Sequence, residues 1–120
     1  MRWNFKDGSP IYQQIIQILQ IGIANGTYPP GEKMPAVRDL ALEAGVNPNT
    51  MQRALSELER DELLYSVRTS GRFVTEDQER LRLLREELSR TYVDEMLTKL
   101  RGLGLSEQEI LDAVRQAAKV

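Results

Sequence analysis

The segment from Gly45 to Pro48, with the sequence Gly-Val-Asn-Pro, limits the possible folds of this chain more than any other segment. Gly45 is typical of the position just beyond a helix C-terminus, where a left-handed backbone is favoured. Asn47 is a favoured N-cap, and Pro48 is tolerated in a helix only within the first turn. One helix therefore ends and another begins within a few residues, and so tight a turn between two helices is typical of a helix-turn-helix.

Apolar residues recur at helical spacing before and after this turn, so three helices are predicted in this part of the chain. The first is expected to have Ser9 as its N-cap and Pro10 as its first helical residue, and to stop at Asn25-Gly26. Residues 27–33 are predicted to form a turn, and the third helix is expected to end near Asp61. The apolar faces of the three helices contain Ile11, Ile15, Ile18, Leu19 and Ile23; then Val37, Leu40, Ala41 and Ala44; then Met51, Ala54, Leu55 and Leu58.

The pattern changes from helical to extended after the third helix. Residues 63–67 and 73–75 are apolar and partly β-branched, and a short turn that contains Gly71 separates them. The sequence thus predicts a β-hairpin with Arg68 and Arg72 at its tip. A hairpin that directly follows a helix-turn-helix is typical of the wing in a winged helix-turn-helix.

Residues 76–120 differ in character from residues 1–75, and the two parts are predicted to be separate domains. Residues 76–100 are predicted to form one long charged helix, which Gly102 and Gly104 then break. The fold class is therefore mainly α (α+β), an N-terminal winged helix-turn-helix followed by a helical segment. A capping box at residues 106–109 begins the last helix, whose apolar face contains Ile110, Leu111, Val114 and Ala118.

A stripe of apolar residues along the long helix would be exposed in a monomer. Pairing with a second copy of the chain would bury this stripe, so the C-terminal segment is predicted to form a homodimer. The alternative is that the helix folds back onto the chain's own helical domain. The residues predicted to form the dimer contact are Leu81, Leu84, Leu88, Tyr92, Met96 and Leu100.

The residue types that the chain lacks exclude whole classes of chemistry. Its 120 residues include no cysteine and no histidine, which removes disulfides, thiolate ligands for zinc and the commonest general base. We therefore expect no catalytic residue, no metal site and no cofactor, and we do not expect an enzyme. No run of about 18 apolar residues is present, and the N-terminus lacks the apolar stretch of a signal peptide. A cytoplasmic, nucleoid-associated protein without membrane contact is expected.

The third predicted helix carries hydrogen-bonding side chains opposite its apolar face. Asn and Gln pair with adenine edges, Arg pairs with guanine, and the N–H groups at a helix N-terminus bind phosphate. Such a helix is suited to enter the major groove of DNA front end first. Any surface helix has polar residues opposite an apolar stripe, so this face alone does not indicate DNA binding. The tight turn and the basic hairpin are the features that favour it. The outward residues are Asn49, Gln52, Arg53, Ser56 and Arg60.

The net charge of −2 does not by itself suggest a nucleic-acid-binding protein, but the charges are unevenly distributed. Residues 1–75 contain eight Lys and Arg and eight Asp and Glu, whereas residues 76–120 contain eight and ten. The distribution of charge, rather than its sum, determines a binding face. Few phosphate contacts are available per subunit, so a single subunit is expected to bind DNA weakly. The cations placed to meet DNA are Lys33, Arg38, Arg53, Arg68 and Arg72.

Three ordered motifs resemble those of the GntR family of bacterial transcription regulators. Residues 31–41, Gly-Glu-Lys-Met-Pro-Ala-Val-Arg-Asp-Leu-Ala, resemble the family motif G-x-x-L-P-S-x-R-x-L-A. Residues 46–51 are similar to the start of the family's recognition helix, and residues 71–74, Gly-Arg-Phe-Val, to its wing motif G-T-F-V. The Asn-Pro-Asn-Thr form and the short C-terminal segment are most similar to the YtrA-type subfamily. The resemblance covers roughly residues 5–75 and implies a DNA-binding winged helix-turn-helix.

The chain also departs from these family motifs. Arg38 matches the motif arginine, so the resemblance implies a DNA contact for it. Pro48 and Gln52 stand where arginines are common, and the base-reading roles of those arginines do not transfer to them. Thr69 replaces the first glycine of the wing, and Arg72 replaces its threonine.

These observations predict a homodimeric, sequence-specific transcription regulator, a repressor, that binds a palindromic, inverted-repeat operator in double-stranded DNA. The alternative is a winged-helix protein-interaction module without specific DNA binding. An unknown small-molecule effector, or none at all, would fit the sequence equally well. Arg68 and Arg72 are both expected to contact the DNA backbone or minor groove from the wing, and Arg72 to strengthen binding to all sequences alike. The residues predicted to bind DNA are Lys33, Arg38, Asn47, Asn49, Thr50, Gln52, Arg53, Arg68, Gly71 and Arg72.

Overall fold

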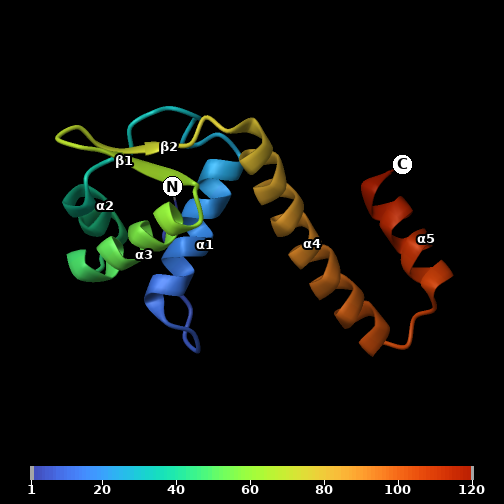
Figure 1. Cartoon of the computed structure of the whole chain (residues 1–120). Helices are drawn as coiled ribbons and strands as arrows, with labels where there is room; N and C mark the ends of the chain where they lie inside the picture. Colours follow the sequence, from blue (N-terminus) through green and yellow to red (C-terminus); the bar gives the residue numbers. More distant parts are fainter. Residues whose placement is uncertain (1, 120) are drawn as a thin grey trace. The chain divides into compact units, whose positions relative to one another are not determined.

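The computed structural model describes residues 2–119, which form five helices and a two-stranded antiparallel sheet (Figure 1). Residues 1 and 120, the outer ends of the two predicted domains, lie outside the described part. The predicted fold class is confirmed. Within residues 2–119, no helix has both the length and the apolar character needed to cross a membrane. The elements are α1 (Ile11–Ala24), α2 (Val37–Ala44), α3 (Pro48–Arg60), β1 (Leu64–Val67), β2 (Gly71–Val74), α4 (Gln78–Gly102) and α5 (Glu107–Ala118).

The chain folds into two compact units. The first runs to Arg85 and contains the three N-terminal helices, the hairpin and the first turns of α4, and the second starts at Glu86. The domain boundary predicted from the sequence, between residues 75 and 76, lies before these turns. By packing, the start of α4 therefore belongs with the helices and strands that precede it.

The turn between α2 and α3 has the conformation that its sequence predicts. Gly45 has a left-handed backbone with φ 71° and ψ 35°, which L-residues with a side chain rarely adopt. Oδ1 of Asn47 accepts a hydrogen bond from the N–H of Asn49 at 2.8 Å, and Pro48 is the first helical residue. The N-cap predicted at Asn47 is thus confirmed, and the cap fixes where α3 begins relative to α2.

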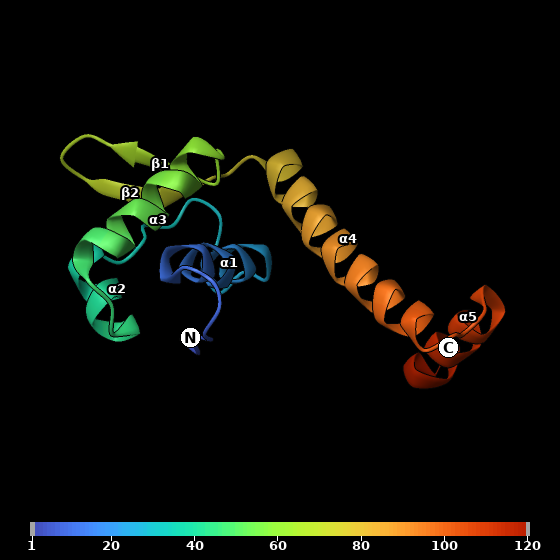
Figure 2. The same ribbon diagram turned by 90° about the horizontal axis from the view of Figure 1, so that it is seen from below.

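The core of the N-terminal unit lies where α3 packs against α1 and α2 (Figures 1 and 2). The four residues predicted to face inward on α3 are all fully buried. Each large apolar side chain buried in this way stabilises the fold by about 1.5–3 kcal/mol. Ile18 and Val37 are only half-buried and Ile11 is exposed, so the predicted faces of α1 and α2 are less completely covered. Fully buried side chains include Ile15, Leu19, Leu40, Met51, Ala54, Leu55, Leu58 and Leu63.

The N-terminus of α1 differs from the prediction by one residue. Pro10 has an extended backbone with ψ 141° and is itself the N-cap, so Ile11 is the first helical residue and Ser9 lies outside the helix. The carbonyl of Ser9 instead accepts a hydrogen bond from Nε2 of the buried Gln14 at 3.0 Å. Gln14 also donates to the carbonyl of Lys6 and accepts from its N–H, both at 2.8 Å. This one side chain therefore holds the segment before α1 in place.

The predicted hairpin is present, and a third segment of the chain pairs with it. β1 and β2 pair along their whole length, and residues 68–70 connect them. Residues 31–34, part of which the sequence predicts as a turn, run beside β2, where the N–H of Met34 donates to the carbonyl of Arg72 at 2.8 Å. Arg72 thus lies within β2, and its predicted position at the hairpin tip is wrong. Arg68 is the arginine that lies in the turn.

The long helix α4 begins two residues later than predicted because Asp77 acts as its N-cap. Oδ1 of Asp77 accepts hydrogen bonds from the N–H of Glu79 at 3.0 Å and from that of Arg80 at 3.2 Å. Nε of Arg80 in turn donates to the carbonyl of Asp61, just beyond α3, at 2.9 Å. The first turn of α4 is therefore attached to the end of α3.

Leu81 and Leu84 are buried within the N-terminal unit, with exposed fractions of 2% and 1%. The sequence placed both in a dimer contact, whereas the structure places them in the chain's own core. The alternative, that the helix packs on its own domain, therefore holds for these two residues. An apolar stripe shows which side of a helix is covered but not what covers it. The sequence therefore could not distinguish Leu81 and Leu84 from the other residues of the stripe.

The C-terminal unit consists of the rest of α4 and of α5, which residues 103–106 connect. Gly102, which was predicted to break the long helix, is its last residue, and Gly104 has a left-handed φ of 85°. The predicted capping box is confirmed. Oγ of Ser106 accepts from the N–H of Glu109 at 3.2 Å, and Oε1 of Glu109 accepts from the N–H of Ser106 at 2.9 Å.

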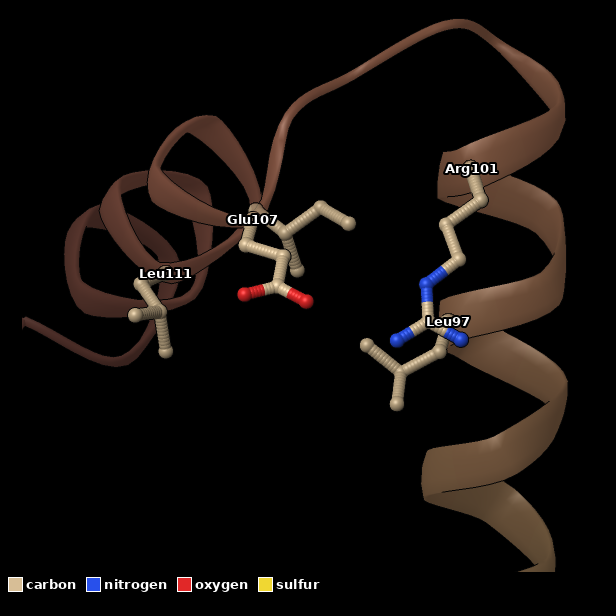
Figure 3. A pocket seen from close by; sticks show the side chains of 5 residues that line it. Leu97, Arg101, Glu107 and Leu111 are labelled. Atoms are coloured by element: carbon tan, nitrogen blue, oxygen red, sulfur yellow. The ribbon is translucent and has the colours of Figure 1, made fainter.

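The helices of the C-terminal unit face each other across a small hollow (Figure 3). Leu97 and Arg101 of α4 and Glu107 and Leu111 of α5 line it, and its volume is about 180 Å³. Ile110 also lines it and is buried. The contact between these two helices is therefore apolar at its centre.

Replacing Leu84 with alanine should lower the free energy of unfolding by about 2–5 kcal/mol, because truncating a buried leucine leaves a cavity. The matched control is Leu83→Ala, since Leu83 precedes it in the same helix and is 38% exposed. The control should cost about 1 kcal/mol or less. Chemical denaturation at one protein concentration measures both values, and equal losses would show that Leu84 is not part of the core.

Candidate nucleic-acid interface

The outward face of α3 is a row of exposed polar side chains. Asn49, Gln52, Arg53 and Ser56 are all exposed, although the opposite face of the same helix is fully buried. Pro48 has no N–H, and the N–H groups of Asn49 and Met51 are bonded to Asn47, so the N–H of Thr50 is the one that the first turn leaves for an anion such as phosphate. The helix therefore presents hydrogen-bonding groups along its side and at its front end.

The hairpin packs beside α3 (Figures 1 and 2). Tyr65 of β1 and Phe73 of β2 stack with their ring centroids 5.7 Å apart, which supports the pairing of the two strands. Arg68 is exposed in the turn that connects them, and the next residue, Thr69, has φ 71°. The turn thus keeps the backbone of a glycine at the position where the sequence replaces the glycine of the family motif.

Lys33 lies across the start of β2. Gly71 has φ 117°, a backbone conformation that L side chains rarely adopt, and a Cβ added to it would lie 3.0 Å from Cε of Lys33, whose flexible side chain would have to shift slightly. Arg38 is exposed in the first turn of α2. Within residues 2–119, Lys33, Arg38 and Arg68 form no ion pair, so their charges are available to phosphate.

An aromatic ring holds Arg53 against α1. The guanidinium carbon of Arg53 lies 3.6 Å from the centroid of the Tyr12 ring, which is a cation–π arrangement. Together with Ile11, Asn49 and Thr50, these two side chains line an open hollow beside the front end of α3. The sequence did not indicate Tyr12 as part of this surface, because no local spacing relates a residue of the first helix to one of the third.

Arg72 connects the hairpin to α3. Its side chain is 17% exposed, and it donates from Nε to Oε1 of Glu59 at 2.5 Å and from Nη1 to Oε1 of Gln52 at 3.3 Å. Oγ of Ser66 donates to the same Glu59 oxygen at 2.5 Å. Partial burial raises the pKa of Glu59, but the hydrogen bonds from Ser66 and Arg72 and the charge of Arg72 together lower it by more, so this pKa lies below its usual value.

Other predicted residues have local partners. Arg60, expected on the outward face, donates from Nη1 to Oε1 of Glu57 at 2.9 Å, one turn earlier in α3. Asn47 uses its side-chain oxygen for the helix cap, which leaves its NH₂ group for any contact with DNA.

Within residues 2–119, no group of three or more acidic side chains is placed to hold a metal ion. The predicted DNA-binding residues therefore lie on three neighbouring regions, which are the start of α2, the outward face of α3 and the hairpin with the segment beside it.

This arrangement is that of a winged helix-turn-helix DNA-binding protein, because the second helix of the motif presents a polar face and a hairpin packs beside it. Residues 11–74 match the family described as bacterial regulatory proteins, gntR family. The chain therefore belongs to the GntR family, and the family resemblance predicted from the sequence is confirmed. It is a DNA-binding transcription regulator and not an enzyme.

Individual relatives agree with this assignment. The chain is 33% identical over 112 residues to the uncharacterized HTH-type transcriptional regulator YhcF of Bacillus subtilis (strain 168), a match that covers 93% of each chain. It is also 33% identical over 95 residues to the HTH-type transcriptional repressor YtrA of the same organism, which covers 74% of this chain and 73% of YtrA. A GntR family transcriptional regulator from Listeria monocytogenes has a similar structure, with a TM-score of 0.87 and 37% identity over 93% of this chain and 98% of that one. The predicted similarity to YtrA-type regulators is thus confirmed.

Replacing Glu59 with glutamine should lower the free energy of unfolding at neutral pH by about 1–2 kcal/mol, because the largely buried Arg72 loses its charged partner. The control is Glu57→Gln, which removes the more exposed pair with Arg60 from the same helix. The control should cost about 0.5 kcal/mol or less.

The cost of Glu59→Gln should also depend on pH. The pKa of Glu59 is lowered in the folded protein, so its stabilising effect is complete above the ordinary glutamate pKa of about 4.3 and is lost as the pH falls through the lower folded value. The difference in unfolding free energy between wild type and variant should therefore shrink from about pH 7 to about pH 3. Denaturation at a series of pH values measures it, and a constant difference would contradict the ion pair.

Proposed function

We propose that this chain is a homodimeric transcriptional repressor that binds an inverted-repeat operator, with α3 of each subunit in the major groove. The observation that carries the proposal is the exposed polar face of α3 with cations beside it that have no ion pair within residues 2–119. Groups that read bases and groups that bind phosphate are the two requirements for recognition of a DNA sequence.

In this proposal, α3 reads the bases and the surrounding residues bind the backbone. Asn49, Gln52 and Arg53 carry amide and guanidinium groups that pair with base edges. The ring of Tyr12 holds Arg53 in place, which reduces the entropy that its side chain loses on binding. The residues proposed to bind phosphate are Lys33, Arg38, Asn47, Thr50 and Arg68, and Gly71 gives Lys33 its path across β2.

The dimer is proposed to form through the C-terminal unit. Tyr92 and Val93 of α4 and Leu111 and Val114 of α5 are all exposed, with Tyr92 at 51%. A second copy of the chain would bury this apolar surface. Two α3 helices held about 34 Å apart in such a dimer would let two weak sites act together on one palindrome. The partly exposed residues Leu88, Met96 and Leu100 of the predicted stripe are proposed to belong to the same contact.

Repression is proposed from the similarity to YtrA, whose name describes a transcriptional repressor. The hollow of about 180 Å³ in the C-terminal unit is smaller than the roughly 300–1,000 Å³ of typical ligand pockets. This hollow alone is therefore too small to enclose a typical small-molecule effector.

Selection of bound sequences from a random DNA pool, with the purified protein at moderate salt, should yield a two-fold-symmetric motif. Its half-sites should lie about one helical turn apart, because one α3 of the dimer reads each half. Affinity for this motif should fall steeply as salt is raised, since binding releases counterions from the phosphates. If no motif emerged from folded protein, specific DNA binding would be excluded, and the tail would become the place to look for a protein partner.

Tyr92→Glu should raise the dissociation constant of the dimer by about tenfold or more, because a carboxylate in an apolar contact is costly to bury. Thr98→Glu is the matched control, since Thr98 is an exposed polar residue on another side of the same helix. Sedimentation equilibrium measures both variants. Equal weakening by the two substitutions would place the dimer contact elsewhere.

A further inference from the structure

The side chain of Arg72 links the wing to two positions on α3. Its Nε donates to Glu59 and its Nη1 donates to Gln52, and these acceptors lie seven residues apart on the same side of the helix. Ser66, which is paired with Arg72 across the hairpin, donates to the same carboxylate. Four side chains thus form one network between the wing and the helix that faces DNA.

This network determines which way round the Gln52 amide lies. Arginine has only hydrogen-bond donors, so the Gln52 atom that faces Arg72 has to be the carbonyl oxygen. The amide nitrogen lies on the other side of the group, where it donates to Oγ of Ser56 at 3.5 Å. That bond is at the long limit for a hydrogen bond and uses one of the two N–H groups, so the nitrogen is available to a base.

The orientation of the amide affects which base Gln52 can recognise. Glutamine recognises adenine with both ends of its amide, because the oxygen accepts from N6 and the nitrogen donates to N7. Arg72 uses one of the two lone pairs of the Gln52 oxygen and places a positive charge beside it, which disfavours a second donor such as adenine N6 at that oxygen. The amide nitrogen is therefore the end of Gln52 that is better placed to pair with a base. Guanine presents two acceptors, N7 and O6, in the major groove and therefore matches a group that donates.

We propose that Arg72 and Glu59 are positioning residues that make Gln52 a hydrogen-bond donor, and that they thereby set a preference for guanine over adenine at the base pair that Gln52 reads. This inference rests on the proposed function, in which α3 lies in the major groove. Arg72 acts through Gln52, and Glu59 acts by holding the guanidinium of Arg72 with a charged hydrogen bond.

The same geometry disfavours the backbone contact that the sequence assigned to Arg72. Its side chain is largely buried and its charge is paired, whereas Arg68 is exposed in the turn and has no ion pair within residues 2–119. To bind phosphate, Arg72 would have to leave Glu59, and the freed carboxylate would then repel that phosphate. Arg68 is the better candidate for the contact that strengthens binding to all sequences alike.

The test compares Arg72→Thr with Arg68→Thr in the full chain. Each substitution removes one positive charge from the hairpin, and threonine is favoured in strands and occupies the position of Arg72 in the family wing motif. Arg72→Thr removes the contact with Gln52, and Arg68→Thr leaves it intact. The base pair to examine is the operator position at which Gln52→Ala loses the base preference of the wild-type protein. Affinities for operators with guanine or adenine at that position are then measured at one salt concentration.

Wild-type protein is expected to favour guanine at that position by about fivefold or more, and Arg72→Thr should abolish the preference or reverse it toward adenine. Glu59→Gln should shift the ratio of the two affinities in the same direction. Arg68→Thr should weaken binding to both operators equally and leave their ratio unchanged. The proposal is overturned if wild type favours adenine, or if Arg72→Thr lowers both affinities equally, as a phosphate contact would.

A measurement without DNA separates this inference from the proposed function. The NMR signals of the Gln52 side-chain NH₂ group, assigned from their absence in Gln52→Ala, should move in Arg72→Thr and stay in place in Arg68→Thr. If they do not move in Arg72→Thr, the positioning role is overturned whatever the result with DNA. If they move but wild-type protein selects no motif from random DNA, the proposed function has failed and the base preference falls with it.

Discussion

The packing of α3 against α1 and α2 is the contact on which the other features of this structure depend. Met51, Leu55 and Leu58 are fully buried in it, and the Asn47 cap fixes the residue at which the helix begins. A helix whose inward side chains are held in this way has its outward side chains held as well, because successive residues are related by a fixed rotation. The polar groups of α3 therefore project from a rigid support, which is what recognition of a base edge requires.

The parts of the fold that the sequence predicted are those that depend on neighbours along the chain. The glycine turn, the Asn47 cap, the capping box of α5 and the spacing of apolar residues are all local signals, and each is found in the structure. The same reasoning placed the outward face of α3 correctly, because the rotation per residue determines it once the buried face is known. The predicted starts of α1 and α4 are wrong by one or two residues, because neighbouring residues compete for the N-cap position and Pro10 and Asp77 take it in the structure.

The features that the sequence did not predict join residues that are distant along the chain. Tyr12 lies beneath Arg53, and Glu59 pairs with Arg72, although neither pair has a spacing that indicates contact. The same limit applies to Leu84, whose place in an apolar stripe is clear from sequence but whose partner is not. Charge and polarity along one helix identify a surface that could bind DNA, whereas the neighbours that orient each side chain come from the tertiary fold.

The pairing of residues 31–34 with β2 has a consequence for how the protein folds. Lys33 and Phe73 are forty residues apart, and the whole helix-turn-helix lies in the loop that this bridge closes. Long-range pairing of this kind forms late, since the entropy of loop closure has to be met before the contact stabilises the chain. Met34 and Val74 are also buried, so detaching the wing would expose part of the core. The recognition helix and the wing are thus expected to fold and unfold together, as one cooperative transition.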